Sequence, residues 1–329
     1  MIAHAKILIV KQGATYDVSN LVSKIRWSGR KGAPARKLEL TFIDDEGYKR
    51  DRTGLAVERG HSVIFYWKGK EIFRGMFTVQ AQPRRRRVLT AKAYDLGIRL
   101  SNNKDTFCYT NRTATEIFLD VCRRFGIPTA NVVDTRYVIP ELPKPNTTAW
   151  DAVADALSLT YRATGVRYYA VCQGEAMTLI ERRMNIVQWV IETGVNLEDY
   201  TLTKSIERVR TRIILKSSEG EVLAEAHNAE LEQRIGIFQD VRRVNDEMND
   251  GQLQQLVEAT LDENNSNIED LKLDAALGQT DVFSGRGVFV AIHPLDISKT
   301  YYVEQDVHTF DRRHHDMSLN LCSATDVTT

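Results

Sequence analysis

The 329-residue chain is poor in cysteine and has no long apolar run. Its four cysteines, Cys108, Cys122, Cys172 and Cys322, lie 14, 50 and 150 residues apart. This spacing offers neither the C-x-x-C pairs of a structural zinc site nor a compact disulfide framework, so we expect buried thiols in a reducing cytosol. No apolar stretch approaches the ~18 residues of a membrane-spanning helix, and residues 7–10 are too short a run for a signal peptide. We therefore expect a protein that is made and kept inside the cell and crosses no membrane as synthesised.

The chain also lacks an excess of charge of either sign. Its 44 Lys and Arg balance 44 Asp and Glu, so no global field draws it to nucleic acid or to an anionic membrane. The motifs G-x-G-x-x-G, G-x-x-x-x-G-K-[ST], G-x-S-x-G and H-E-x-x-H are absent as well. Nucleotide cradling, nucleophile-elbow hydrolysis and zincin chemistry thus lack their usual sequence signature, and we expect no cofactor.

From residue 1 to about 98, apolar and polar residues alternate along the chain with a period of two. Leu38, Leu40 and Phe42 alternate with polar residues, and Val63, Phe65 and Trp67 repeat the pattern. Turn residues such as Gly69 separate these runs. Residues 1–98 are therefore predicted to form a first antiparallel β-barrel or tightly curled sheet.

Helical signals appear after Asn103. Thr113 and Glu116 have the spacing of a capping box, and Gly126 and Pro128 follow where that helix would end. A second helix is expected to begin at Thr148, after the Pro-containing linker "IPELPKPN", and to end at Gly165, and a hairpin is expected to turn at Gly174. Residues 99–185 are therefore predicted to be a small α+β insertion module.

Strand patterns return over residues 186–329, with one amphipathic helix, "DGQLQQLVEATLDEN". In "RVRTRIIL" the apolar residues face one way, and the other face carries Arg208, Arg210 and Arg212. The fold class predicted is mainly β with an α+β insertion. Two barrel-like antiparallel β domains, 1–98 and 186–329, would flank the module.

Two basic sequences are candidate interfaces. The densest charge run is Arg84, Arg85, Arg86 and Arg87, and the second set is Arg208, Arg210 and Arg212. Four successive arginines without interleaved aromatic residues could contact an acidic protein surface. They could also contact a phosphate, or they could form a solvated hairpin tip. These three interpretations remain open from the sequence.

The stretch "YYVEQDVHTFDRRHHDMSLNL", residues 301–321, concentrates histidines and carboxylates. A three-residue loop at 311–313 would place His308 opposite Asp316 as a cross-strand structural pair. His315 would share its face with apolar residues, and alternation would put His314 on the opposite face. His308, His314 and Asp316 could share one face as a metal ligand set, but two regular strands offer no cleft, so we expect neither metal nor catalysis here.

The chain resembles the tail hub proteins of contractile-tailed phages and defective prophages, relatives of the late control D family. The resemblance covers nearly the whole chain in order. It rests on "LELTF", "AYDLGIRLSNN", "TATEIFLDVCRRFGIP", "RVRTRIIL", "EGEVLAEAHNAELEQRIGIFQ" and the closing histidine-rich stretch. No single one of these motifs is diagnostic, and their order and spacing carry the weight.

The resemblance implies a homotrimeric ring in which each chain contributes two barrels. The ring would adapt a hexameric tail tube to a trimeric central spike, among other baseplate proteins. DNA or another payload would pass its lumen only transiently. The protein would reside in the host cytoplasm during assembly and then in the virion or tail-like particle. Two other classes remain as alternatives: a wall-degrading or metal-dependent hydrolase of the tail tip, and a nucleic-acid-binding barrel that uses Arg84 to Arg87.

Overall fold

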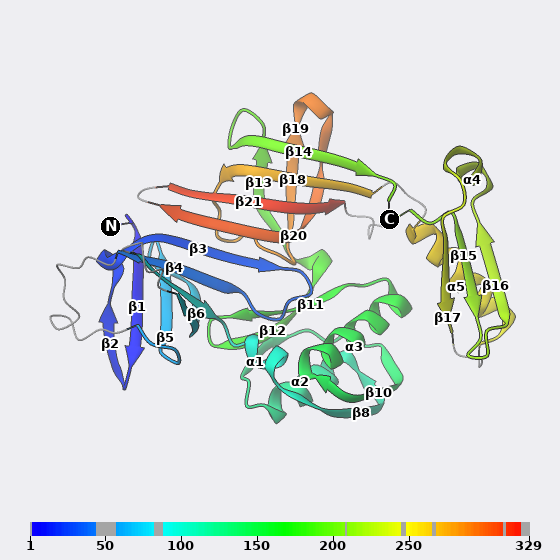
Figure 1. The fold of residues 1–329 in the computed structure, drawn as a ribbon, viewed down its shortest axis with the longest axis horizontal. Coiled ribbons are helices and arrows are strands. Elements are labelled where there is room, and N and C mark those ends of the chain that lie inside the picture. Colours follow the sequence, from blue (N-terminus) through cyan, green and yellow to red (C-terminus); the bar gives the residue numbers. More distant parts are fainter. Residues whose placement is uncertain are drawn as a thin grey trace. The chain divides into compact units, whose positions relative to one another are not determined.

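The structure is a computed structural model, and it describes residues 2–43, 57–81, 88–207, 209–244, 248–264, 268–311 and 314–323. Strands dominate these ranges, and the helices are few and short (Figure 1). The predicted mainly β fold with an α+β insertion is confirmed. Among the described residues, no helix combines the length and the apolar character needed to cross a bilayer.

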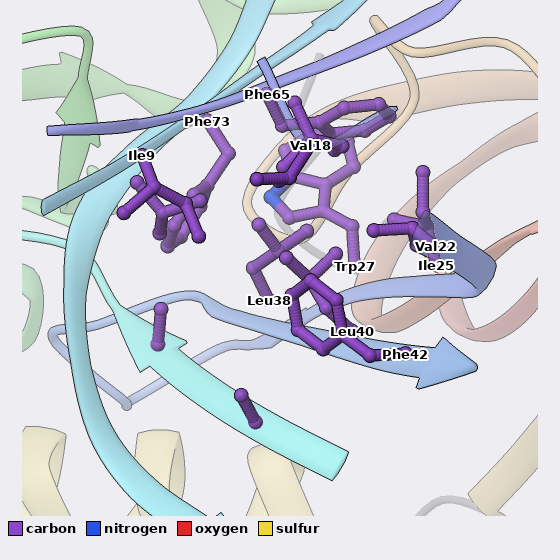
Figure 2. Packing of buried hydrophobic residues seen from close by; sticks show 14 of the residues in the cluster. Ile9, Val18, Val22, Ile25, Trp27, Leu38, Leu40, Phe42, Phe65 and Phe73 are labelled. Carbon is purple, nitrogen blue, oxygen red and sulfur yellow. The ribbon is translucent and has the colours of Figure 1, made fainter. Parts of the chain in front are cut away.

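The N-terminal β region is one antiparallel, curled part of the sheet in the order β3-β4-β7-β6-β5-β1-β2. Its strands are β1 (Ala5–Lys11), β2 (Ala14–Asp17), β3 (Val22–Arg30), β4 (Lys37–Ile43), β5 (Ser62–Trp67), β6 (Lys70–Ala81) and β7 (Val88–Tyr94), with a 3-10 turn at Ser19–Leu21. Alternate residues point inward. Figure 2 shows Trp27 packed among Val18, Leu38 and Phe65 in the resulting core.

The insertion module packs two long helices and one short helix against short sheets. Its elements are α1 (Ile98–Asn102), β8 (Lys104–Thr113), α2 (Ala114–Arg124), β9 (Thr129–Val132), β10 (Val138–Thr148), α3 (Ala149–Thr164), β11 (Tyr168–Gln173), β12 (Ala176–Glu181) and a 3-10 turn at Arg182–Met184. β8 pairs with β10, and a second sheet has the order β11-β12-β9. One apolar core includes Phe107, Phe118, Val153 and Leu179.

Both long helices of the module begin and end where the sequence predicts. Thr113 and Glu116 form the capping box of α2. The side chain of Thr148 accepts a hydrogen bond from the backbone N–H of Asp151 at the start of α3. α3 ends at Gly165, which adopts a left-handed conformation with φ of 69°. These caps satisfy backbone groups that the first and last turns of a helix leave unpaired.

The stretch "IPELPKPN" is a strand and not the predicted linker. It lies in β10, whose pairing with β8 is irregular between Lys144 and Thr147. A proline cannot donate to a ladder, so a strand tolerates it where its N–H would face away from the partner. The sheet of β8 and β10 has only these two strands, so both are edge strands and prolines fit there.

The C-terminal β region continues the same sheet. Its strands are β13 (Ile186–Glu192), β14 (Leu197–Ser205), β18 (Ile268–Leu277), β19 (Gly287–Ile292), β20 (Ile297–Asp311) and β21 (His314–Ser323), with a 3-10 turn at His293–Leu295. The main path runs β14-β18-β21-β20-β3, and β19 joins β13 to β20. Because β20 pairs with β3, the two predicted β regions share one 13-stranded sheet.

Residues 202–271 form a compact unit of their own, which the predicted division into three domains did not separate. This unit contains β15 (Arg212–Lys216), β16 (Val222–His227), α4 (Ala229–Ile235), β17 (Gln239–Arg243) and α5 (Asp250–Asn264). The sheet order is β16-β15-β17. Leu253, Val257 and Leu261 of α5 pack with Ile213 and Leu215 of β15. The strand pattern of "RVRTRIIL" therefore belongs to a separate small sheet and not to a barrel wall.

Candidate functional site

The pairing of β3 with β20 joins the two β regions, and we call it the seam. Ile25 lies opposite Phe310, Trp27 opposite His308, and Gly29 opposite Asp306. β20 is also paired with β21 on its other side. Any load or distortion that passes from one β region to the other through the sheet must therefore cross the seam.

A buried ion pair lies at the seam. Arg36 donates from Nη1 to Oδ1 of Asp306 at 3.0 Å and from Nη2 to Oδ2 at 2.5 Å. The backbone N–H of Ser284 donates to the same carboxylate at 2.7 Å. Burial alone would raise the pKa of Asp306, but the charge and hydrogen bonds of Arg36 outweigh it, and the pKa lies below its usual value. The carboxylate is therefore ionised at neutral pH.

The sequence around Arg36 is shaped to hold the guanidinium. Its Cζ lies 3.9 Å from the ring centre of Trp27, a cation–π contact. A Cβ on Gly29 would approach Nη1 of Arg36 to 2.3 Å, so glycine leaves the room that the guanidinium needs. Gly29 lies in β3 with extended backbone, and its role here is space and not an unusual φ.

Two histidines extend the network. Nδ1 of His308 lies 2.9 Å from Nε2 of His315, and Nε2 of His308 lies 2.9 Å from the carbonyl oxygen of Val282. A carbonyl only accepts, so His308 donates from Nε2, and in the neutral ring its Nδ1 accepts from His315. Burial lowers the pKa of His308 to about 4 and that of His315 to about 3. Both rings are neutral at pH 7.

The predicted register of the terminal hairpin is wrong by one residue. Asp311 pairs with His314, so that two residues and not three connect β20 and β21. His308 lies opposite Met317, and Asp316 lies opposite Thr309, so His308 and Asp316 are not a cross-strand pair. A slip of one residue moves every side chain to the other face. The polar face of β20 is buried because Arg36, 270 residues away in sequence, neutralises Asp306.

The faces of the two adjacent histidines are as predicted. His315 is buried on the face that also carries Met317, Leu319 and Leu321, while His314 is exposed on the other face. The metal prediction is a separate matter. Within the ranges that the structure describes, no group of three or more His, Cys, Asp or Glu is placed to hold a metal ion.

The predicted arginine interfaces are described only in part. Arg84, Arg85, Arg86, Arg87 and Arg208 lie outside the described residues. Arg210 donates from Nη1 to the carbonyl of Val209 at 2.9 Å. Arg212 forms a two-pronged contact with Glu232, at 3.0 and 3.1 Å, inside its own compact unit. Arg210 and Arg212 both belong to the unit 202–271, and their role as an interface stays a prediction.

Sequence reasoning missed an exposed apolar strip on β13 and β19. Among the described strands β13 pairs only with β19, and on its other edge the side chain of Asn196 bonds to the backbone of Val190 and Glu192. Ile186 and Val190 of β13 are 49% and 46% exposed, and Phe289 lies opposite Val190 on the same face. The run "IVQWVIE" carried a signal for this strip, because Val187, Trp189 and Ile191 fill one face and the other face still carries Ile186 and Val190. A strand with exposed apolar side chains on its outer face is suited to contact another chain.

Comparison with known proteins agrees with this architecture. The model of the YqbQ-like family matches residues 25–322. Protein XkdQ of the phage-like element PBSX of Bacillus subtilis (strain 168) is 31% identical over 304 residues, which are 92% of each chain. Its match supports the tail-protein resemblance seen in the sequence.

Solved structures show the same fold at low sequence identity. The 43 kDa tail protein of prophage MuSo2 from Shewanella oneidensis has a TM-score of 0.70 at 12% identity, covering 96% of this chain and 97% of its own. A tail protein of Neisseria meningitidis MC58 has a TM-score of 0.68 at 10% identity, covering 97% of both chains. With the fold of these two tail proteins and a family match over most of its length, the chain belongs to the YqbQ-like family.

Proposed function

We propose that this chain is a structural hub of a contractile phage tail or phage-tail-like particle and that it catalyses nothing. The observation that carries the proposal is the match of fold over nearly the full length of two tail proteins, one of them from a prophage. The relative from a phage-like element supports the same role. We infer that the protein assembles in the host cytoplasm and then resides in the virion or particle.

The finer proposal is a ring of three chains that joins a hexameric tail tube to a trimeric spike. Each chain has two β regions in one sheet, so three chains supply six, the number needed to face a sixfold tube. The exposed strip of Ile186, Val190 and Phe289 is our candidate for a surface that neighbouring chains or other baseplate proteins cover. We propose Arg84 to Arg87 as a further contact, with an acidic neighbour.

The ring is tested by the mass of the assembly in solution. One chain has a mass of 37.4 kDa, so three have 112.2 kDa. We expect this mass by mass photometry or sedimentation, either for the protein alone or after addition of the spike protein from the same gene cluster. Val190→Glu should reduce the trimer, and Val222→Glu, an exposed valine of the unit 202–271, is the matched control. A protein that stays monomeric or dimeric at high concentration with the spike present would exclude the ring.

A further inference from the structure

The apolar strip on β13 and β19 needs a counterpart if three chains form the proposed ring. In a cyclic ring every interface is heterologous, so a surface of one chain meets a different surface of the next chain. Two copies of the strip that faced each other would instead close a dimer. The counterpart of the strip must therefore be another exposed surface of the same chain.

The N-terminal β region offers one such surface. Among its residues whose burial the structure describes, the exposed large apolar side chains are Tyr16 of β2, at 39%, and Met76 and Val79 of β6, at 41% and 43%. Met76 lies opposite Tyr94 of β7, and Val79 lies opposite Lys92. Opposite residues of paired strands share a face, and so do residues two apart in one strand. Met76, Val79 and Tyr94 therefore form one outer surface, which we call the β6 patch.

A β-bulge creates the β6 patch. The register of β6 against β7 shifts between Phe77 and Val79. Strict alternation from Met76 would turn Val79 to the inner face, where Phe77 is buried in the core. The extra residue of the bulge brings Val79 to the outer face instead. Bulges re-aim side chains and recur at functional positions, so the exposure of Val79 is a built feature of the strand.

The end of the β6 patch at Lys92 is positively charged. Nζ of Lys92 lies 3.8 Å and Nζ of Lys37 3.9 Å from the same oxygen, Oε2 of Glu39. Arg26, which is exposed, lies opposite Glu39 in β3. Three cations thus lie around one carboxylate. At the other end of the patch Arg74 pairs with two glutamates, so the excess of positive charge is confined to the Lys92 end.

The apolar strip has a carboxylate at one end. Glu192 follows Val190 by two residues in β13 and so lies on the same face. Its Oε1 lies 2.8 Å from Nε2 of His293, and its side chain is 36% exposed. The carboxylate can therefore meet a cation of another chain without leaving its own strand. The strip and the β6 patch thus match in character, since each has an apolar centre and the charges at one end are opposite.

We propose that the apolar strip of one chain packs on the β6 patch of the next chain, with Glu192 of the first beside Lys92 of the second. This contact rests on the proposed ring and names the two surfaces that close it. Inside a chain the seam joins the C-terminal β region to the N-terminal one. Between chains the strip and the β6 patch would join the same two kinds of region, so both sets of junctions are heterologous and the ring can close.

The apolar part of the contact is tested with the full-length protein, under the conditions in which the unaltered protein forms the trimer. Mass photometry measures the concentration at which half of the chains are in trimers. We expect Met76→Glu to raise this concentration at least about tenfold, because it places a charge in the apolar centre. Tyr16→Glu is the matched control, since Tyr16 is nearly as exposed and lies on β2, three strands along the sheet from β6. It should change the concentration less than about twofold.

The charged part is tested by exchanging the charges across the contact. Lys92→Glu and Glu192→Lys should each raise the same concentration about fivefold. Both substitutions in one chain should restore it to within about twofold of the parent, which excludes misfolding as the cause of the single effects. Lys6→Glu together with Glu192→Lys has the same net charge and is the control, because Lys6 is an exposed lysine of β1. This combination should not restore the trimer.

Failure of the contact and failure of the ring give different results. If no trimer forms even with the spike protein, the ring and this contact both fall. If Val190→Glu weakens the trimer but Met76→Glu has no more effect than Tyr16→Glu, the ring stands and the strip has another counterpart. A dimer that depends on Val190 alone would show that the strip pairs with itself. Equal restoration by Lys6→Glu and Lys92→Glu would also overturn the contact.

Discussion

Arg36 and Asp306 are 270 residues apart in the chain and meet in a buried two-pronged contact. Removal of one member of a buried pair leaves the other charge without compensation, which costs far more than the pair contributes over an apolar substitute. Surface pairs behave differently, because water solvates both partners after the contact is lost. The side chains at the seam should therefore respond to substitution much more strongly than ion pairs on the surface.

We expect Asp306→Asn to lower the free energy of unfolding by about 3 to 5 kcal/mol, because the guanidinium of Arg36 stays buried beside a neutral amide. The matched control is Asp281→Asn in the exposed pair Lys70–Asp281, whose atoms lie 2.7 Å apart. This control should cost no more than about 1 kcal/mol. Urea unfolding followed by circular dichroism measures both, and equal costs would contradict the role assigned to the seam.

The histidine pair predicts a loss of stability in acid. A histidine in the unfolded chain has a pKa of about 6.5, and burial lowers that of His308 to about 4 and that of His315 to about 3. As the pH falls below about 6.5, the two histidines bind protons in the unfolded chain but stay neutral in the folded chain, which favours the unfolded state. The contribution of the neutral pair is thus complete above pH 6.5, decreases toward pH 4 and is lost once the folded rings are protonated.

The measurement is the difference in unfolding free energy between pH 7 and pH 5. We expect His308→Gln to show a smaller difference than the parent, and His314→Gln, which changes an exposed neighbour, to show the same difference as the parent. The carboxyl of Asp95, whose pKa burial raises to about 7, is present in all three proteins and does not affect the comparison. Parallel pH profiles for all three would show that the buried rings are not responsible.

At the scale of elements, helices α2 and α3 depend on local signals. The capping box of α2 is complete: the backbone N–H of Glu116 donates to the Thr113 hydroxyl at 3.2 Å, and that of Thr113 donates to the Glu116 carboxylate at 2.9 Å. These bonds satisfy donors that the first turn of a helix otherwise leaves to water. The start of the helix is therefore fixed by residues within it and immediately before it.

We expect Thr113→Ala to reduce stability by about 0.5 to 2 kcal/mol, because the N-cap hydrogen bond is lost. Thr110→Ala removes an exposed threonine of β8 from outside the capping box, and its effect should stay within about 0.5 kcal/mol. Thermal unfolding with both variants in one buffer makes the comparison. A cap variant no less stable than the control would mean that the module's core alone determines where α2 begins.

Elements that depend on local signals could be predicted from the sequence, and elements that depend on distant partners could not. The ends of α2 and α3 and the turn at Gly174 follow from caps and glycine, and all are present. The register of the terminal hairpin could not be predicted from local signals, because Asp306 and His308 are polar and yet are buried, Asp306 against Arg36. A pattern of polar and apolar residues within 21 positions contains no information on a partner near the other end of the chain.

The separate sheet of residues 202–271 was missed for a similar reason. Alternation in β15 identifies a half-buried strand but does not say which sheet it joins. A cleft of the main unit beside β11 was not foreseen either, since its lining comes from four distant segments of the chain, namely residues 30–36, α3, residues 167–172 and residues 284–285. The arginines singled out by the sequence, by contrast, either lie outside the described residues or pair within their own unit.

At the scale of the whole molecule, charge is distributed unevenly between the two compact units. Residues 202–271 contain 15 Asp and Glu against 8 Lys and Arg, a net charge of −7, so the other residues of this neutral chain carry +7. The chain leaves the main sheet along β14 and returns along β18, and these strands are neighbours in the sheet. The acidic unit is therefore an insertion between two adjacent strands.

We expect the main unit to fold without this insertion. Residues 207–266 can be replaced by a short Gly-Ser linker, because β14 and β18 already lie side by side and a short connection can span their ends. The variant should unfold cooperatively and keep the oligomeric state of the parent, as measured by differential scanning calorimetry and mass photometry. A soluble variant without a cooperative transition would show that the inserted unit is needed for the sheet.

The seam also sets the order in which the protein can fold during synthesis. β3 is made within the first 30 residues, but its partner β20 holds Phe310, which pairs with Ile25. At 5 to 20 residues per second, a ribosome needs roughly 15 to 60 s to make the 285 residues between them. For that time one edge of β3 lacks its native partner. A nascent chain therefore spends most of its synthesis with an unpaired strand edge that could pair with a neighbouring nascent chain. A bound chaperone would cover this edge, and slow initiation of translation would keep neighbouring nascent chains apart.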